Sequence, residues 1–134
     1  MRLYIADDNV EFAEFCAEVA TAEGWHVETS HNGSGLLTIL KTETNPAPAL
    51  ILCDINMPDV DGIEVIRTLS DPNKLFRIRF ITGGQMTDAL AARMIGEARD
   101  LNVGRFLIKP ISLAALQAVL SEEAQTLSEM AHPS

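Results

Sequence analysis

The sequence predicts a doubly wound α/β fold with a five-stranded parallel sheet and five helices. Short apolar segments rich in β-branched residues occur five times along the chain, and each is followed by a segment whose apolar residues return every three or four positions. One apolar segment, residues 49–53, has no polar alternation, as expected of a central strand covered on both faces. Regular alternation of strand and helix implies parallel strands joined by right-handed crossovers, with helices on both faces of the sheet.

The first strand and the first helix are predicted at the start of the chain. Residues 2–6 are apolar and partly β-branched, and this strand stops at Asp7 and Asp8. From Asn9 onward, apolar residues recur at helical spacing while glutamates fall on another face, which indicates an amphipathic helix. Gly24 is expected to end this helix, because glycine readily leaves helical geometry.

The next three elements lead to the middle of the sheet. Residues 25–30 are expected to form the second strand. A short second helix is predicted around the apolar residues of 36–40, and the Asn-Pro-Ala-Pro sequence at 45–48 closes it. The third strand, residues 49–53, then places Asp54 at its end.

The second half of the chain repeats the alternation. A third helix is predicted over 63–69, a strand over 77–82, a fourth helix from about Thr87 to Asp100, and a fifth strand over 104–108. Ser112 is the expected N-cap of the last helix. The outer part of that helix is expected to be a solvated face rather than a site, and it carries Glu122, Glu123 and Glu129.

Polar residues follow four of the five predicted strands. They are Asp7 with Asp8, then Asp54, Thr82 and Lys109. In open α/β sheets, ligands bind at the carboxyl ends of the strands, near the topological switch point. Because the carboxyl ends of parallel strands share one edge of the sheet, we expect these side chains to lie together.

This set of side chains fits a cation and an anion of phosphoryl type. Three carboxylates at neighbouring strand ends repel one another unless a cation lies among them, and hard oxygen ligands favour Mg²⁺ or Mn²⁺ over zinc. Lys109 supplies an ammonium and Thr82 a hydroxyl donor, which with backbone N–H groups would hold an anionic group. Asp54 is the natural acceptor, because carboxylates act as nucleophiles toward phosphoryl groups.

With these residues in place, the sequence resembles the receiver domain of two-component response regulators, in the single-domain form of chemotaxis regulators, over nearly its whole length. Each motif alone is common, and their joint placement on strand ends is specific. The matching motifs are Asp7-Asp8, Asp54 with Met57-Pro58 and Gly62, Thr82, and Lys109-Pro110. The resemblance implies a flavodoxin-like sheet with the strand order 2-1-3-4-5.

The resemblance also implies a function and a role for each acidic residue. Asp54 would receive a phosphoryl group from the phosphohistidine of a histidine kinase. Mg²⁺, or Mn²⁺ in its place, would be bound by Asp8, Asp54 and the backbone carbonyl of Asn56, with Asp7 acting mainly through water. Lys109 would pair with the phosphoryl oxygens.

Further residues enter through the same resemblance. Thr82 and Gly83 would bind the phosphoryl group, and the movement of Thr82 would be coupled to the aromatic residue three positions before the lysine, here Phe106. A cis peptide bond before Pro110 would aim the lysine side chain. Phosphorylation would then shift a two-state equilibrium of the fourth helix, fifth strand and fifth helix, which exposes a surface for a partner.

Three features depart from the family pattern. Phe106 lacks the hydroxyl of the tyrosine often found there, so any switch relies on ring packing. The segment from Thr82 to Lys109 is a few residues longer than usual, which leaves the fourth helix and the signalling face open. Gly84 has no side chain where many relatives place one, which leaves the lifetime of the phosphoryl group open.

The implied partners are a histidine kinase or phosphotransfer protein, and a downstream protein target or output domain. Whether the chain forms a homodimer is left open. Two alternatives to the phosphoacceptor stay open: a receiver-like interaction module that needs no phosphate, and the regulatory part of a longer regulator whose output domain is absent. We do not expect an enzyme beyond one that catalyses its own phosphorylation and dephosphorylation.

The whole chain sets further expectations. Its 134 residues suit one compact domain, predicted over 1–130 with a tail at 131–134. The net charge of −9 argues against direct nucleic-acid binding. No apolar run approaches the roughly 18 residues that span a bilayer, and an acidic pair ends the apolar start of the chain, unlike a signal peptide. We therefore expect a cytoplasmic protein without membrane insertion, whose core holds Trp25 and the reduced thiols of Cys16 and Cys53.

Overall fold

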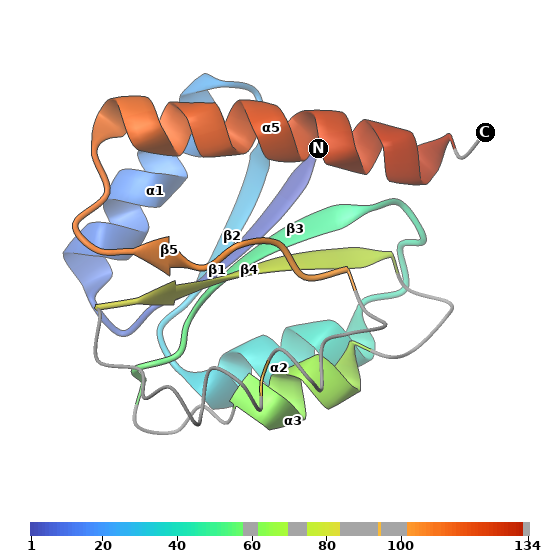
Figure 1. The fold of residues 1–134 in the computed structure, drawn as a ribbon. Coiled ribbons are helices and arrows are strands. Elements are labelled where there is room, and N and C mark those ends of the chain that lie inside the picture. The colour runs from blue at the N-terminus through green and yellow to red at the C-terminus, as the bar shows by residue number, and fades with distance from the viewer. Residues whose placement is uncertain (58–61, 70–74, 84–93, 95–101, 133–134) are drawn as a thin grey trace.

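The computed structural model describes residues 1–57, 62–69, 75–83, 94 and 102–132. Five parallel strands form one sheet in the order β2-β1-β3-β4-β5 (Figure 1). The elements in chain order are β1 (Arg2–Ala6), α1 (Val10–Ala22), β2 (His26–Ser30), α2 (Gly33–Thr42), β3 (Ala49–Asp54), α3 (Gly62–Thr68), β4 (Phe76–Thr82), β5 (Leu107–Ile108) and α5 (Leu113–Ala131). The predicted α/β class and the strand order are confirmed.

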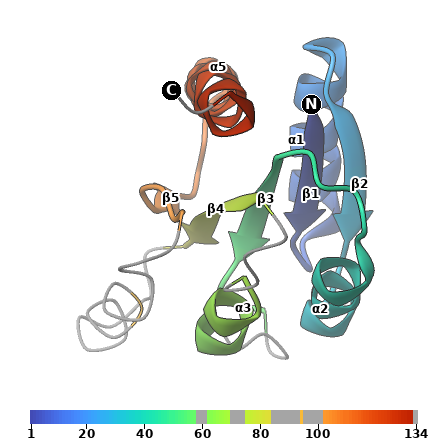
Figure 2. The same cartoon turned by 90° about the vertical axis from the view of Figure 1, so that its right-hand side faces the viewer.

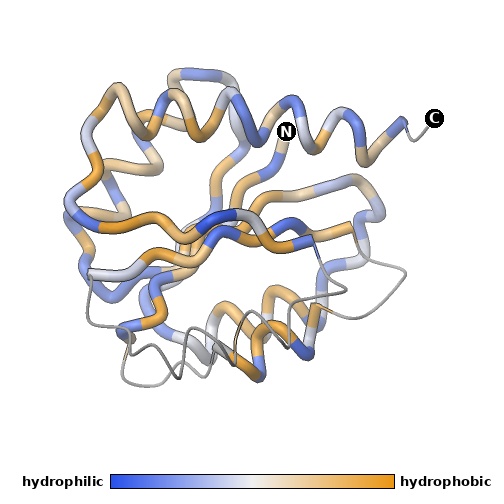
Figure 3. Tube along the Cα trace, in the orientation of Figure 1, coloured by the Kyte–Doolittle hydropathy of each residue, from blue (hydrophilic) through white to orange (hydrophobic). Residues whose placement is uncertain are grey.

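Helices cover both faces of the sheet, so that the core has two layers. Figure 2 shows α1 and α5 on one face and α2 and α3 on the other. Strand β3 is buried along its whole length, and its side chains alternate between the two layers. Leu50 and Leu52 pack with α1 and α5, whereas Ile51 and Cys53 pack with α2 and α3. The apolar central strands stand out in Figure 3, and they explain why residues 49–53 lack polar alternation.

The predicted ends of the helices are largely correct. The side chain of Asn9 accepts a hydrogen bond from the N–H of Phe12 at the start of α1, and Gly24, with φ at +91°, follows its end. The hydroxyl of Ser112 accepts from the N–H of Ala115 at 3.1 Å, as predicted for the N-cap of α5. The predicted helix from about Thr87 to Asp100 falls mostly outside the described residues. None of the helices in the described part of the chain is long and apolar enough to cross a membrane.

The last strand is shorter than predicted. Within residues 102–108, only Leu107 and Ile108 pair with β4 as a strand, and Val103 makes a single bridge to Ile78. The cause is a side chain of β4, since Nε of Arg79 donates to the carbonyl of Arg105 at 2.6 Å and takes an acceptor that a sheet ladder would use. The prediction of a strand over 104–108 is therefore wrong for its first three residues.

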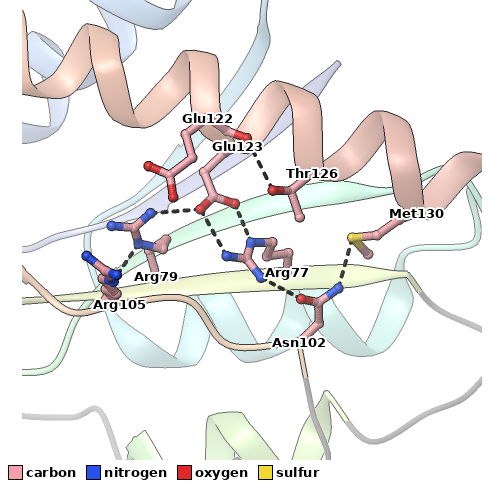
Figure 4. A network of polar contacts seen from close by, with 8 residues as sticks. All are labelled: Arg77, Arg79, Asn102, Arg105, Glu122, Glu123, Thr126 and Met130. Carbon is pink, nitrogen blue, oxygen red and sulfur yellow. Dashed lines mark hydrogen bonds and ion pairs between the residues drawn. The ribbon is translucent and has the colours of Figure 1, made fainter.

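A buried ion-pair cluster corrects a second prediction. Glu123 of α5 is fully buried, not solvated, and lies between Arg77 and Arg79 of β4 (Figure 4). Its Oε1 atom accepts from Nη1 of Arg79 at 2.8 Å and from Nη2 of Arg77 at 3.2 Å. Arg77 also donates to the side chain of Asn102 at 2.6 Å. Glu122 and Glu129 are exposed, as predicted.

Both thiols and the indole lie in the core, as predicted. Cys16 and Cys53 are buried and unpaired, and Trp25 is 6% exposed. Burial raises the pKa of the Cys16 thiol to about 12, and the nearby Asp7 carboxylate adds to the effect. Burial also raises the pKa of the Cys53 thiol. Both residues therefore act as small apolar side chains rather than as nucleophiles.

Candidate functional site

The parallel sheet brings the predicted strand-end residues to one edge. Asp7 directly follows β1, Asp54 is the last residue of β3, Thr82 is the last of β4, and Lys109 directly follows β5. Backbone hydrogen bonds fix these ends: the N–H of Asp7 donates to Ser30 at 3.0 Å and the N–H of Lys109 to Thr82 at 2.8 Å. Because the strands run in one direction, residues far apart in sequence meet here without any special loop.

Three carboxylates form an acidic cluster at this edge. One oxygen from each of Asp7, Asp8 and Asp54 lies within 4.8 Å of the other two. Asp7 is fully buried and Asp54 is 3% exposed, whereas Asp8 is exposed. Such close anionic groups repel one another in a partly dehydrated site, so this arrangement needs positive charge.

The ammonium of Lys109 supplies part of that charge. Its Nζ atom lies 2.8 Å from Oδ2 of Asp7 and 3.2 Å from Oδ2 of Asp54. Partial burial opposes the charged ammonium, but the contact with Asp7 and the charges of both carboxylates outweigh it, so that the pKa of Lys109 is raised. The lysine is therefore fully charged at neutral pH and bridges the phosphoacceptor candidate to its neighbour.

The surroundings of Asp7 disfavour the charged form of its carboxyl group. Burial raises the pKa of this carboxyl, and the charge of Asp54 raises it further, although Lys109 and the backbone N–H of Asn9 act in the opposite direction. Oδ1 accepts from that N–H at 2.8 Å. Oδ2 is buried and, among the described residues, receives no aligned hydrogen bond in addition to its ion pair with Lys109. One acceptor position on Asp7 is thus left for a further donor or a cation.

The start of the loop after β3 orients the side chain of Asp54. The backbone N–H of Asn56 donates to Oδ1 of Asp54 at 2.7 Å, which fixes the orientation of the carboxylate. Asn56 and Gly83 are both exposed. Among the described residues, a Cβ added to Gly83 would meet the Asn56 side chain alone, at 3.8 Å. The second oxygen of Asp54, Oδ2, lies 3.2 Å from the ammonium of Lys109.

The remaining predicted residues come from the end of β4 and from both sides of β5. Thr82 is buried at the end of β4 and pairs in the sheet with Ile108. Phe106 is half-buried and packs against Phe80, with ring centroids 6.1 Å apart. The peptide bond between Lys109 and Pro110 is cis, the geometry that the resemblance implies. Gly84 lies outside the described residues.

Two neighbours of the cluster were not predicted from the sequence. The ring of Phe12, in the first turn of α1, lies under the ammonium of Lys109, with Nζ 4.4 Å from its centroid. Nδ1 of His31 lies 3.1 Å from the backbone carbonyl oxygen of Asp7. The sequence positions of both residues could have indicated that they lie near the cluster. Phe12 follows Asp8 by about one helical turn, and His31 follows β2, the strand that neighbours β1.

Comparison with known proteins places this geometry in a family. The family model of the response regulator receiver domain matches residues 3–121. The transcriptional regulatory protein TctD of Salmonella typhimurium is 32% identical, over 97% of this chain and 56% of that protein. The response regulator receiver protein CpdR of Brucella abortus is 33% identical, over 61% of this chain and 66% of that protein. Several curated relatives, such as TctD, are thus about twice as long as this chain.

Solved structures agree with this assignment. A signal receiver domain from Bermanella marisrubri is 25% identical with a TM-score of 0.68, covering 90% of this chain and 95% of its own. A CheY-like receiver domain protein from Methanospirillum hungatei shares the fold at 18% identity, with a TM-score of 0.77, covering 96% of this chain and 97% of its own. With the family model matched over most of its length, the chain belongs to the family of response regulator receiver domains.

Proposed function

We propose that Asp54 is the phosphoacceptor of this receiver domain. The observation that carries the proposal is the position of Lys109, whose ammonium bridges the carboxylates of Asp54 and Asp7 at the carboxyl ends of the strands. An oxygen of Asp54 attacks phosphorus, the new O–P bond forms, and the P–N bond to the donor histidine breaks with its electron pair left on the imidazole. The ammonium then stabilises the negative charge on the phosphoryl oxygens.

The donor set fits a hard divalent cation. Three carboxylates with oxygens within 4.8 Å of one another, one of them exposed, suit Mg²⁺ with several retained waters. Asp8, Asp54 and the carbonyl of Asn56 would hold it, with Asp7 acting through water; Mn²⁺ prefers the same ligands. When bound, the cation neutralises the charge that develops on the transferring phosphoryl group.

Other residues would bind the product and pass on the signal. Thr82, the last residue of β4, and Gly83, which follows it, would contact the phosphoryl oxygens, and Phe106 would follow the movement of Thr82. The face around Phe106 would then change its affinity for a downstream protein or output domain. Receiver domains of response regulators interact with histidine kinases and output domains, and the greater length of relatives such as TctD supports an output partner here. We infer no catalysis beyond the protein's own phosphorylation and dephosphorylation.

The test is the intact mass of the protein after incubation with acetyl phosphate, with and without MgCl₂. The wild type is expected to gain one phosphoryl group only with Mg²⁺, and Asp54→Asn to gain none. Glu14→Gln, which removes an exposed carboxylate of α1, serves as the matched control and should react like the wild type. An adduct that persists in folded Asp54→Asn would place the phosphoryl group elsewhere. No adduct on the folded wild type would favour a phosphate-independent interaction module.

A further inference from the structure

We propose that Phe12 is a positioning residue for Lys109. Its ring would keep the ammonium at the edge of the sheet while the N–H donors of the lysine pass from the carboxylates to the incoming phosphoryl group. The inference rests on the proposed phosphoacceptor function, and it adds a side chain that neither the sequence motifs nor the acidic cluster includes.

The geometry of the contact is that of a cation over an aromatic face. Nζ of Lys109 lies 4.4 Å from the centroid of the Phe12 ring, well inside the limit of about 6 Å for such contacts. The lysine side chain is 23% exposed, so that water surrounds the ammonium only in part. The same ammonium contacts Asp7 and Asp54, so the ring is a third group that surrounds it.

Hydrogen bonds at the start of α1 link the position of the Phe12 ring to the acidic cluster. Oδ1 of Asp7 accepts from the N–H of Asn9 at 2.8 Å, and Oδ1 of Asn9 accepts from the N–H of Phe12 at 3.1 Å. The ring contacts Lys109, and Lys109 returns to Oδ2 of Asp7. The contacts thus lead from Asp7 through Asn9, Phe12 and Lys109 back to Asp7. The helix cap that starts α1 therefore also restricts the position of the lysine side chain.

An aromatic ring suits this role better than another hydrogen-bond acceptor. An ammonium has three N–H donors, and during phosphorylation it must exchange carboxylate oxygens for phosphoryl oxygens. A ring attracts the positive charge through its quadrupole and does not need an aligned N–H. Phe12 can therefore hold the charge in place throughout the exchange, whereas a third carboxylate would compete with the phosphoryl group.

The experiment compares Phe12→Leu with Phe15→Leu as its matched control. Both phenylalanines lie on α1, both are half-buried, and their ring centroids are 6.4 Å apart. In the described part of the chain, the ammonium of Lys109 lies over the ring of Phe12 and not over that of Phe15. The rate constant for phosphorylation by acetyl phosphate at saturating Mg²⁺ is the first readout. We expect a fall of about 2- to 30-fold for Phe12→Leu, the range of a cation–aromatic contact converted to a rate, and less than about twofold for Phe15→Leu.

A conservative variant separates the ring from its bulk. Phe12→Tyr keeps the aromatic face and is expected to restore most of the rate that Phe12→Leu loses. Equal rates for Phe12→Leu and Phe15→Leu, or no recovery in Phe12→Tyr, would overturn the proposal.

A second readout does not depend on phosphorylation. The urea unfolding midpoints of the wild type, Phe12→Leu, Lys109→Met and the double variant form a double-mutant cycle. A second cycle, with Phe15→Leu in place of Phe12→Leu, is its control. We expect the shifts to be non-additive for the Phe12 pair and additive for the Phe15 pair. Additive shifts for both pairs would overturn the contact. If the wild type does not react with acetyl phosphate, the phosphoacceptor function fails, whereas the cycle still decides whether the ring holds the lysine.

Discussion

Among single residues, Tyr4 offers the cleanest test of side-chain environment, because it is the only tyrosine in the chain. It lies in β1, buried, with its hydroxyl donating to the carboxylate of Glu43 and accepting from Arg2 at 2.8 Å. Burial and the hydrogen bond to Glu43 raise the pKa of Tyr4 to about 12. The folded chain therefore strongly favours the neutral phenol.

We predict that the absorbance titration of tyrosinate will have its midpoint near pH 12 in the folded protein. Because the folded pKa lies above the unfolded value of 10.0, stability is fully present below pH 10 and declines as the pH rises toward 12. Glu43→Gln removes a negative charge and weakens the acceptor, and should move the midpoint down. A folded wild type that titrates near its ordinary value would contradict this account of Tyr4.

At the scale of elements, the cluster around Glu123 joins three parts of the chain. Glu123 of α5 pairs with Arg77 and Arg79 of β4, and the two arginines also bind the segment before β5, through Asn102 and the carbonyl of Arg105 (Figure 4). Two guanidinium groups share one fully buried carboxylate. Loss of that carboxylate would leave both cations without their common partner in a poorly hydrated place.

We predict that Glu123→Gln destabilises the protein by about 3 to 5 kcal/mol, the cost of breaking a buried ion pair from one side. The lower end is expected, because the Arg77 side chain is 16% exposed and water can reach it. Equilibrium unfolding in urea measures the change. Glu122→Gln, the exposed neighbour on the same helix, is the control and should change stability by less than about 0.5 kcal/mol. Similar losses for both variants would contradict a buried charge cluster.

The burial of Glu123 was not predicted from the sequence. Glu123 follows Leu120 by three positions and precedes Leu127 by four, so it lies on the buried stripe of α5 that the leucines define. A glutamate is usually exposed to solvent, whereas the position of Glu123 on the leucine stripe indicated the core. Arg77 and Arg79 alternate with Ile78 and thus share one face of β4, which was the signal for their partner. A sequence pattern fixes which face a residue takes, but pairing of charges across elements depends on packing.

For the whole molecule, the sheet and the acidic cluster were predictable because they depend on few facts. Five strand-helix alternations determine a parallel sheet, and a parallel sheet brings Asp7, Asp54 and Lys109 to one edge whatever the details of the helices. The shortened β5 and the ring of Phe12 under Lys109 were not predictable in this way. Both arise from side-chain contacts between distant segments, which periodicity does not record.

The charge of the whole molecule and of its acidic cluster leads to a prediction for Mg²⁺. The chain has a net charge of −9, so that any salt reduces its self-repulsion, whereas a cation bound in the site specifically reduces the repulsion among its close carboxylates that Lys109 leaves. We expect MgCl₂ to raise the thermal unfolding midpoint more than NaCl does at the same ionic strength. At about 100 times the dissociation constant, the gain in unfolding free energy is about 2.7 kcal/mol.

Asp8→Asn decides whether that gain comes from the proposed site. Asp8 is the exposed member of the cluster. Its replacement by asparagine removes the negative charge of one proposed cation ligand with little change in packing. The variant is expected to lose most of the Mg²⁺-specific shift and to keep the response to NaCl, while Glu14→Gln, which removes an equal charge elsewhere, keeps both. A Mg²⁺ shift equal to that of NaCl in the wild type would mean that screening alone acts, and the cation site would have to be abandoned. A specific shift that survives in Asp8→Asn would move the cation away from this residue, because a site built from three carboxylates cannot lose one without losing affinity.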